Sequence, residues 1–144
     1  MSRSTRAKFM MIVVIVFAIY SILWGLAPYE KINFPARFIL DLADWPLGNF
    51  SAPLDKNTKF LSAIGAGLLC AVSIFLGGIV VPAIREGNRS IIRTTIFAMT
   101  AWYIIDCIGS IVSGVTSNIF FNSVYYGLVL IPLLWKDRKE KEPT

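Results

Sequence analysis

The spacing of the apolar residues most constrains what this 144-residue chain can form, because they fall into four blocks of 17 to 25 residues between charged or turn-forming stretches. A helix needs about 20 consecutive apolar residues to cross the hydrocarbon core of a bilayer. The blocks cover 9–28, 60–84, 94–115 and 119–135. The pattern predicts an all-α integral membrane bundle of four transmembrane helices, in a single domain that covers 1–144.

The composition agrees with a membrane protein rather than a soluble domain. Hydrophobic residues make up 56% of the chain and charged residues 16%, and the mean hydropathy is +0.64. An average soluble domain carries about 25% charged residues. The first block is longer than the core of about 7 to 15 residues in a secretory signal, so we interpret it as a retained helix. The fourth block is just long enough to cross a bilayer.

The basic residues predict the orientation of the helices, because Lys and Arg beside a span resist translocation. Ten of them flank the blocks on one side: Arg3, Arg6, Lys8, Arg85, Arg89, Arg93, Lys136, Arg138, Lys139 and Lys141. The connection 29–59 on the other side holds four basic and four acidic residues. Both termini, including the tail 136–144, are therefore expected in the cytoplasm. This asymmetry also argues against a dual-topology transporter.

The outer loop 29–59 is too long to be structureless in a compact protein. Pro35 is typical of a helix start and Pro46 of a helix stop, which predicts a short helix near 34–45. Its apolar side chains share one side, away from its charged residues: Phe34, Phe38, Ile39, Leu42 and Trp45. This pattern is typical of an amphipathic interfacial helix. The helix either caps the bundle, or it docks a partner or covers a cavity.

The residues that are missing exclude several classes of function. The chain contains no histidine, which excludes imidazole ligands to haem, histidine-containing zinc sites and histidine general bases. Cys70 and Cys107 lie inside apolar blocks without a Cys-x-x-Cys motif, so we expect inert thiols. Phosphate-binding loops, carboxylate pairs and serine–lysine nucleophiles are also missing. We therefore expect no catalytic residue, metal site or cofactor. No nucleic-acid partner is expected either, because membrane topology explains the basic residues.

Asp106 is the one ionisable carboxyl group inside a predicted span. It lies about 12 residues from the cytoplasmic end of 94–115, near the bilayer midplane, where a charge costs roughly 3 kcal/mol on insertion scales. Its side of the helix holds mainly polar, aromatic and small residues: Met99, Trp102, Tyr103, Gly109, Ser110, Ser113 and Ser117. The opposite side is aliphatic: Ile104, Ile108, Ile111 and Val115. We expect the Asp106 side to face protein or water and the aliphatic side to face lipid.

A neutral, hydrogen-bonded carboxyl is the simplest state for Asp106, because no Lys or Arg lies at its depth. The residues at matching depth on the other helices are uncharged: Tyr20, Ser21, Cys70, Ser73, Tyr125 and Tyr126. We expect the third helix to turn Asp106 toward the second, with Ser73 or a tyrosine hydroxyl within hydrogen-bonding distance. The candidate polar site is therefore Asp106, Tyr103, Ser110, Ser113 and Ser73.

Three interpretations of this site stay open: a polar contact that holds helices together, a proton or ligand site, and a contact between chains. Small residues four apart favour close packing of the second and third helices in lipid: Gly67 with Ala71, Ser73 with Gly77, and Gly109 with Ser113. Asn118 and Asn122 flank the turn before the fourth helix, and we interpret them first as helix-end hydrogen-bonding residues.

Five strings within residues 9–135 carry a resemblance: PARFILDLADWPL (35–47), FLSAIGAGLL (60–69), VVPAIREG (80–87), AWYIIDCIGSIVSG (101–114) and NIFFN (118–122). Together they resemble an uncharacterised family of small four-helix bacterial membrane proteins. The resemblance implies an integral protein of the bacterial cytoplasmic (inner) membrane with both termini inside, in agreement with the distribution of charge. It implies no catalytic residue.

Two classes of function fit these features. The first is a non-enzymatic accessory, assembly or stabilising subunit of a larger inner-membrane complex, such as a bioenergetic one. Small size, the lack of cofactor ligands and the aliphatic side of the third helix favour it. The second is a homo-oligomeric, proton-coupled transporter of small molecules in which Asp106 titrates. Four helices rarely enclose a path for a substrate, so this function requires a dimer or larger. The expected partners are the lipid bilayer and other membrane subunits or further copies of the chain.

Overall fold

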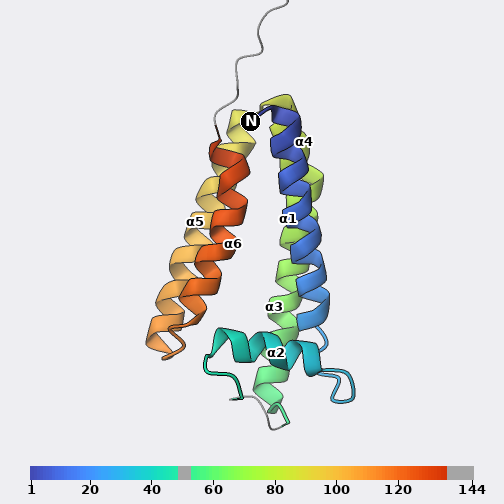
Figure 1. Ribbon diagram of the computed structural model, residues 1–144, viewed down its shortest axis with the longest axis vertical. Helices are drawn as coiled ribbons and strands as arrows, with labels where there is room; N and C mark the ends of the chain where they lie inside the picture. Colours follow the sequence, from blue (N-terminus) through green and yellow to red (C-terminus); the bar gives the residue numbers. More distant parts are fainter. Residues whose placement is uncertain (49–52, 136–144) are drawn as a thin grey trace, which may run out of the picture.

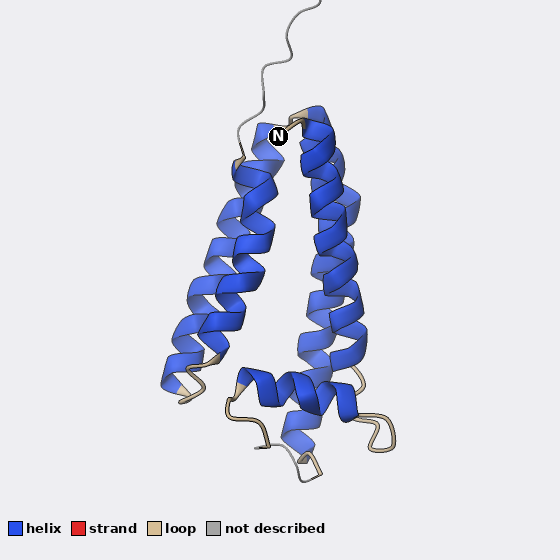
Figure 2. Ribbon diagram, in the orientation of Figure 1, coloured by secondary structure: helices blue, strands red, loops and turns tan. Residues whose placement is uncertain are grey.

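The computed structural model describes residues 1–48 and 53–135. Every regular element in these residues is helical (Figure 2): α1 (Arg3–Trp24), α2 (Phe34–Ala43), α3 (Lys56–Phe75), the π-helix η1 (Leu76–Val80), α4 (Val81–Glu86), α5 (Arg89–Val112) and α6 (Asn118–Leu134). The all-α fold class is confirmed. The predicted tail 136–144 lies outside the described residues.

Three helices are long and apolar enough to cross a membrane. They are α1, with 22 residues, the continuous helix formed by α3, η1 and α4, with 31, and α5, with 24. The predicted fourth span, α6, is also apolar but has 17 residues. These lengths and compositions indicate a membrane protein.

Two long helices begin earlier than the apolar blocks because side chains cap their first backbone N–H groups. The Ser2 hydroxyl accepts a hydrogen bond from the Thr5 amide at 3.1 Å, and α1 begins six residues earlier than predicted. Asn88 Oδ1 accepts from the Ser90 amide at 3.2 Å, and α5 begins five residues early. Hydropathy detects the apolar part of a helix and misses such polar first turns.

Small residues of α3 bring it close to α1. A Cβ atom added at Gly65 would lie 2.3 Å from the Trp24 ring, and one added at Gly77 would lie 3.3 Å from a Val14 methyl group. Real Cβ atoms do not approach other atoms as closely as the first distance. The glycines therefore permit the contact between the two helices, as small residues do in other membrane proteins.

The predicted packing of the second long helix against the third is limited to one end, where η1 and α4 contact α5. A Cβ atom at Gly67 or Gly109 would meet no atom within 4 Å, and α5 packs mainly on α6. The physical reason is that a short turn after α5 places α6 directly beside it. α1 already covers the side of this long helix that holds Gly65 of α3 and Gly77 of η1.

We expect Gly65→Ala to destabilise the fold more than Gly67→Ala, its matched control. Only the first variant places a methyl group against Trp24, and overpacking costs about 1 to 3 kcal/mol. The control should gain helix propensity at no steric cost. The free energy of unfolding in detergent, measured for both variants, checks the expectation. Equal stability would contradict the close contact between α1 and α3.

The long helices form two antiparallel pairs, α1 with α3–α4 and α5 with α6 (Figure 1). The pairs approach each other near the start of α1 and separate toward α2. The main cluster of buried apolar residues joins them at the end where they meet: Ala7, Met10, Val13, Phe17, Leu76, Val80, Val81, Ile84, Met99, Val129 and Leu133. Within the described residues, Met99 is the only member of this core that α5 supplies.

Arg6 links the two pairs at the same end. Its side chain is 5% exposed, its Nε donates to the Pro132 carbonyl at 2.7 Å, and its Nη2 donates to the Leu133 carbonyl at 3.2 Å. The last carbonyl groups of a helix have no partner within that helix. The guanidinium therefore caps the C-terminus of α6 with charge-assisted hydrogen bonds and ties it to α1.

Replacing Arg6 with Met should lower the free energy of unfolding by about 2 to 3 kcal/mol, because carbonyl groups at the end of α6 lose their charged donor. Arg85→Met is the matched control, since Arg85 is exposed. Thermal unfolding of both purified variants tests this. An Arg6→Met protein as stable as the control would show that the guanidinium contributes nothing to the contact between the pairs.

The predicted helix near 34–45 is present as α2. It lies across one end of the fold, away from the start of α1 (Figure 1). Its apolar residues do not share one environment, which corrects the expectation. Ala36 is buried with Ala27 and Leu54 in a small second core, and Ile39 is also buried. Phe34, Phe38 and Trp45 are exposed, while Leu42 is half-buried. Ala36 and Ile39 make the contact with the bundle, and the small side chain of Ala36 lets α2 approach closely.

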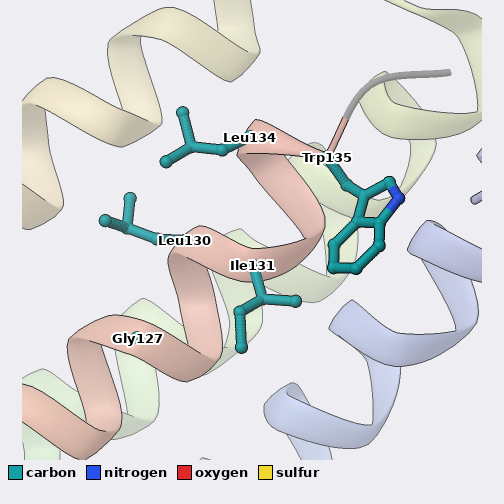
Figure 3. Close-up of a pocket in the computed structure, with 5 residues that line it drawn as sticks. All are labelled: Gly127, Leu130, Ile131, Leu134 and Trp135. Carbon is teal, nitrogen blue, oxygen red and sulfur yellow. The ribbon is translucent and has the colours of Figure 1, made fainter.

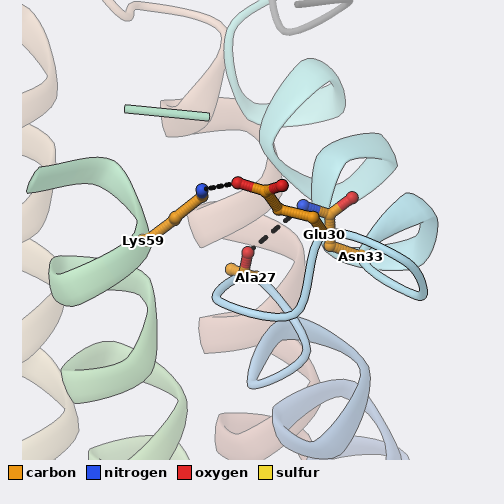
Figure 4. Close-up of polar contacts among 4 residues, drawn as sticks. All are labelled: Ala27, Glu30, Asn33 and Lys59. Atoms are coloured by element: carbon orange, nitrogen blue, oxygen red, sulfur yellow. Dashed lines mark hydrogen bonds and ion pairs between the residues drawn. The ribbon is translucent and has the colours of Figure 1, made fainter. Parts of the chain in front are cut away.

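Two polar contacts fix the chain that leads into α2 (Figure 4). Asn33 Nδ2 donates to the Ala27 carbonyl at 3.3 Å, and Lys59 Nζ lies 2.5 Å from Glu30 Oε1. The hydrogen bond from Lys59, together with its charge, lowers the pKa of Glu30. Any stability from this pair is present at neutral pH and is lost as the pH falls through that lowered pKa. Exposed pairs contribute little, so this contact mainly orients the loop.

Candidate functional site

Asp106 is held by hydrogen-bond donors from α6 and from its own helix. Its Oδ1 accepts hydrogen bonds from Asn122 Nδ2 at 2.8 Å, Asn118 Nδ2 at 3.1 Å and Ser110 Oγ at 3.3 Å. Asn118 Nδ2 also lies 2.9 Å from Ser110 Oγ, to which it donates. Ser110 and Asn122 are buried, and Asp106 is half-buried. Mutual hydrogen bonds offset the cost of placing these polar groups between helices.

The contact continues along both helices. Tyr103 OH lies 2.9 Å from Ser123 Oγ, and Thr100 Oγ1 lies 2.7 Å from Tyr126 OH. The rings of Tyr103 and Tyr126 stack with their centroids 4.6 Å apart and 10° between their planes. We call this set of eight residues the polar seam: Thr100, Tyr103, Asp106, Ser110, Asn118, Asn122, Ser123 and Tyr126.

Helical spacing explains why the seam residues meet. On α5 the seam residues recur every three or four positions, and on α6 Asn118, Asn122 and Tyr126 do so with Ser123 beside them, which places each set on one side of its helix. The turn that joins α5 to α6 contains Gly114 with a φ of 79°, a left-handed conformation that favours glycine. The chain then runs back antiparallel to α5. Each step along α5 is therefore matched by a step in the opposite direction along α6, and polar residues equally distant from the turn face one another.

Ser117, which precedes α6, connects this end of the seam to α2. Its hydroxyl donates to the Ala43 carbonyl at 2.6 Å and accepts from the Trp45 amide at 3.0 Å. Ala43 is the last residue of α2, so its carbonyl accepts no hydrogen bond from within that helix. One serine thus caps α2 and fixes its C-terminal end against the start of α6.

The structure brings Tyr103 and Ser110 of the predicted site together with Asp106, but not Ser113 or Ser73. Ser113 is the exposed residue that ends α5. Ser73 is buried in α3, where its hydroxyl donates to the Leu69 carbonyl at 2.8 Å. The expectation that Ser73 binds Asp106 is wrong, because α5 turns this side toward α6. Ile104, Ile108 and Ile111 on the opposite side are each more than half exposed, as predicted.

Asn118 and Asn122 are the partners that sequence reasoning assigned to another role. A signal for them exists: two asparagines four residues apart directly follow a short turn, and a short turn makes its flanking helices neighbours. Residues equally distant from such a turn lie opposite each other. Counting back from the turn, rather than matching depths between distant helices, would have paired both asparagines with Asp106.

The position of Asp106 along its helix also differs from the expectation. It lies 17 residues after Arg89, where α5 begins, and six residues before Val112, where α5 ends. At about 1.5 Å per residue it is therefore much closer to the α6 turn than to the start of α5. The expected 12 residues from the start of the helix become 17, because Asn88 caps α5 five residues before residue 94.

The chemistry available to the seam is hydrogen bonding around one carboxyl group. The other titratable side chains of the seam are the phenols Tyr103 and Tyr126. In the described part of the chain, no group of three or more His, Cys, Asp or Glu side chains could hold a metal ion. The carboxyl oxygen that accepts three hydrogen bonds is fully engaged with its neighbours. This arrangement holds α5 to α6 without requiring a ligand.

A shallow apolar pocket lies elsewhere on α6 (Figure 3). Its lining comes from the last turns of the helix and the residue that follows: Gly127, Leu130, Ile131, Leu134 and Trp135. No seam residue lines it. Ligand sites usually combine an apolar lining with a few polar groups that orient the ligand, and these five residues supply little beyond the Trp135 indole N–H.

Comparisons with protein families, curated proteins and solved structures found no match for this chain. The site must therefore be interpreted from its own residues.

Two substitutions at Asp106 should differ in stability. Asn keeps an oxygen that can accept hydrogen bonds from Asn118, Asn122 and Ser110. Asp106→Asn should therefore leave the free energy of unfolding nearly unchanged. Leu leaves those donors without an acceptor, and Asp106→Leu should cost about 1 to 2 kcal/mol of unfolding free energy. The control is Thr94→Leu, at an exposed position of the same helix. Melting of the purified variants tests this, and equal stability of the Asn and Leu variants would remove support for a structural contact.

Proposed function

We propose that this chain is a four-pass protein of the bacterial cytoplasmic membrane with both termini inside. We further propose that it acts without catalysis, as an accessory, assembly or stabilising subunit of a larger inner-membrane complex, for instance a bioenergetic one. The lipid bilayer and other membrane subunits would be its partners.

Contacts at both ends of α6 support a fourth crossing. At its start, Ser117 contacts the end of α2, and at its end Pro132 and Leu133 accept hydrogen bonds from Arg6 near the start of α1. Its length of about 25 Å is close to the thickness of the hydrocarbon core. The starts of α1 and α5 and the end of α4, which carry basic residues, lie together at the Arg6 end (Figure 1). Positive charge there supports a cytoplasmic position.

The observation that carries the proposed role is the small burial of α5. Only 6% of its most apolar stretch is buried, against 28% in both α1 and the α3–α4 helix. α5 exposes seven large apolar side chains: Phe97, Trp102, Ile104, Ile105, Ile108, Ile111 and Val112. Because the polar seam satisfies the other side within the α5–α6 pair, this surface is free to pack on helices of a partner subunit.

The alternative is a homo-oligomeric, proton-coupled transporter of small molecules that uses Asp106. One observation favours it: Asp106 is half-buried rather than fully enclosed, so part of this residue is accessible from outside the α5–α6 pair. A proton relay, however, usually needs several ionisable stations, and the seam holds one carboxyl.

Native mass spectrometry of the tagged chain, extracted in a mild detergent at native expression level, separates the two functions. The first predicts a heteromeric complex of fixed stoichiometry that is lost in the Ile105→Ala/Ile108→Ala variant. The matched control, Ile15→Ala/Ile19→Ala on the exposed surface of α1, should keep the complex. A homo-oligomer alone, with transport abolished by Asp106→Asn, would favour the transporter instead.

A further inference from the structure

Neither the fold nor the proposed role explains why three aromatic side chains of α2 and the residues that follow it are exposed. Phe34 is 74% exposed, Phe38 is 46% exposed, and Trp45, just after the helix, is 60% exposed. Phe34 and Phe38 lie four positions apart and so share one side of α2. Neighbouring apolar side chains that are exposed together mark surfaces that meet a membrane or another protein.

α2 is held firmly by contacts that leave these rings outward. Ala36 and Ile39 form its buried side. Asn33 ties its N-terminal end to the Ala27 carbonyl after α1, and Ser117 ties its C-terminal end to α6. The aromatic residues therefore belong to a segment that is fixed across the ends of the long helices, where Figures 1 and 2 show α2.

The depth of α2 follows from α6. Ser117 precedes the first residue of α6 and contacts the last residue of α2, so α2 lies at the level where α6 begins. If α6 crosses the hydrocarbon core, that level is the boundary between acyl chains and headgroups. Trp and Tyr gather at this depth in membrane proteins because their rings suit an environment that is apolar on one side and hydrated on the other. Trp24, the last residue of α1, packs against the small core that contains Ala36 of α2.

We propose that Phe34, Phe38 and Trp45 insert into the outer boundary of the bilayer and anchor α2 to the lipid surface. The partner is the zone where headgroups meet acyl chains, whatever the headgroup charge. The outer loop carries four basic and four acidic residues, so it gains no net attraction to anionic lipid. Aromatic burial, not charge, drives the insertion. The inference rests on the proposed membrane crossing but not on the proposed role as a subunit.

Tryptophan fluorescence tests the inference, because the chain has four tryptophans at very different positions. One variant keeps only Trp45 (Trp24→Phe, Trp102→Phe, Trp135→Phe). Its matched control keeps only Trp102, which lies in the interior of α5. Both are reconstituted in phosphatidylcholine vesicles that contain lipid brominated either near the headgroup or near the end of the acyl chain, and aqueous iodide is added separately.

We expect Trp45 to be quenched more by the shallow brominated lipid than by the deep one, and Trp102 more by the deep lipid. Adding anionic lipid or salt should leave the Trp45 result unchanged. Quenching of Trp45 by iodide with no quenching by brominated lipid would overturn the inference and leave the rings for a protein partner. Deep quenching of Trp45 would overturn it as well. If Trp102 also escaped brominated lipid, the membrane crossing itself would fail.

A spin label at position 38 covers the case in which the triple variants do not fold. Phe38→Cys is made in a Cys70→Ala/Cys107→Ala background and labelled with a nitroxide. Greater accessibility to oxygen than to a water-soluble nickel complex is expected for a ring position inserted in lipid. The reverse order would overturn the inference.

Discussion

The hydrogen bonds from Arg6 to the end of α6 determine how the two helix pairs are joined. A bilayer offers little water to helix ends, so their last carbonyl groups need donors from the protein. One guanidinium supplies donors to two of them, and the main apolar core surrounds the same end of the fold. Farther along, the pairs touch through ring contacts of Tyr125 with Phe17 and Tyr20. Polar capping and apolar burial thus act at one place, and the pairs diverge beyond it.

The polar seam explains why the other side of α5 stays uncovered by its own chain. A carboxyl group between helices must be satisfied by nearby donors, and Asn118 and Asn122 provide them from the helix that follows in the chain. Because these donors come from a sequence neighbour, α5 does not need contacts with α1 or α3 to satisfy Asp106. Its remaining surface can stay aliphatic and uncovered by its own chain. The same local pairing that stabilises the hairpin therefore leaves an apolar helix side for lipid or for another protein.

Hydropathy alone predicts the existence and order of the long helices, since apolar length is what a bilayer selects. It does not predict where they begin, because Ser2 and Asn88 extend α1 and α5 through polar turns. Sequence reasoning also predicted the wrong hydrogen-bond partners for Asp106. Matching depths assumed a closed bundle, whereas the fold is two helix pairs that meet mainly at one end. The seam was within reach of sequence reasoning, but the capping role of Arg6 was not, because flanking basic residues are ordinarily attributed to topology.

The position of Asp106 along α5 bears on the choice between a structural and a proton-carrying role. The 17 residues back to Arg89 correspond to about 25 Å of helix. Over that distance the seam offers the hydroxyls of Tyr103 and Thr100, and beyond them Met99 belongs to the apolar core with Val129 and Leu133. A proton that left Asp106 toward the Arg6 end would have to cross this core without an ionisable station. The arrangement therefore favours a carboxyl group that holds α5 to α6.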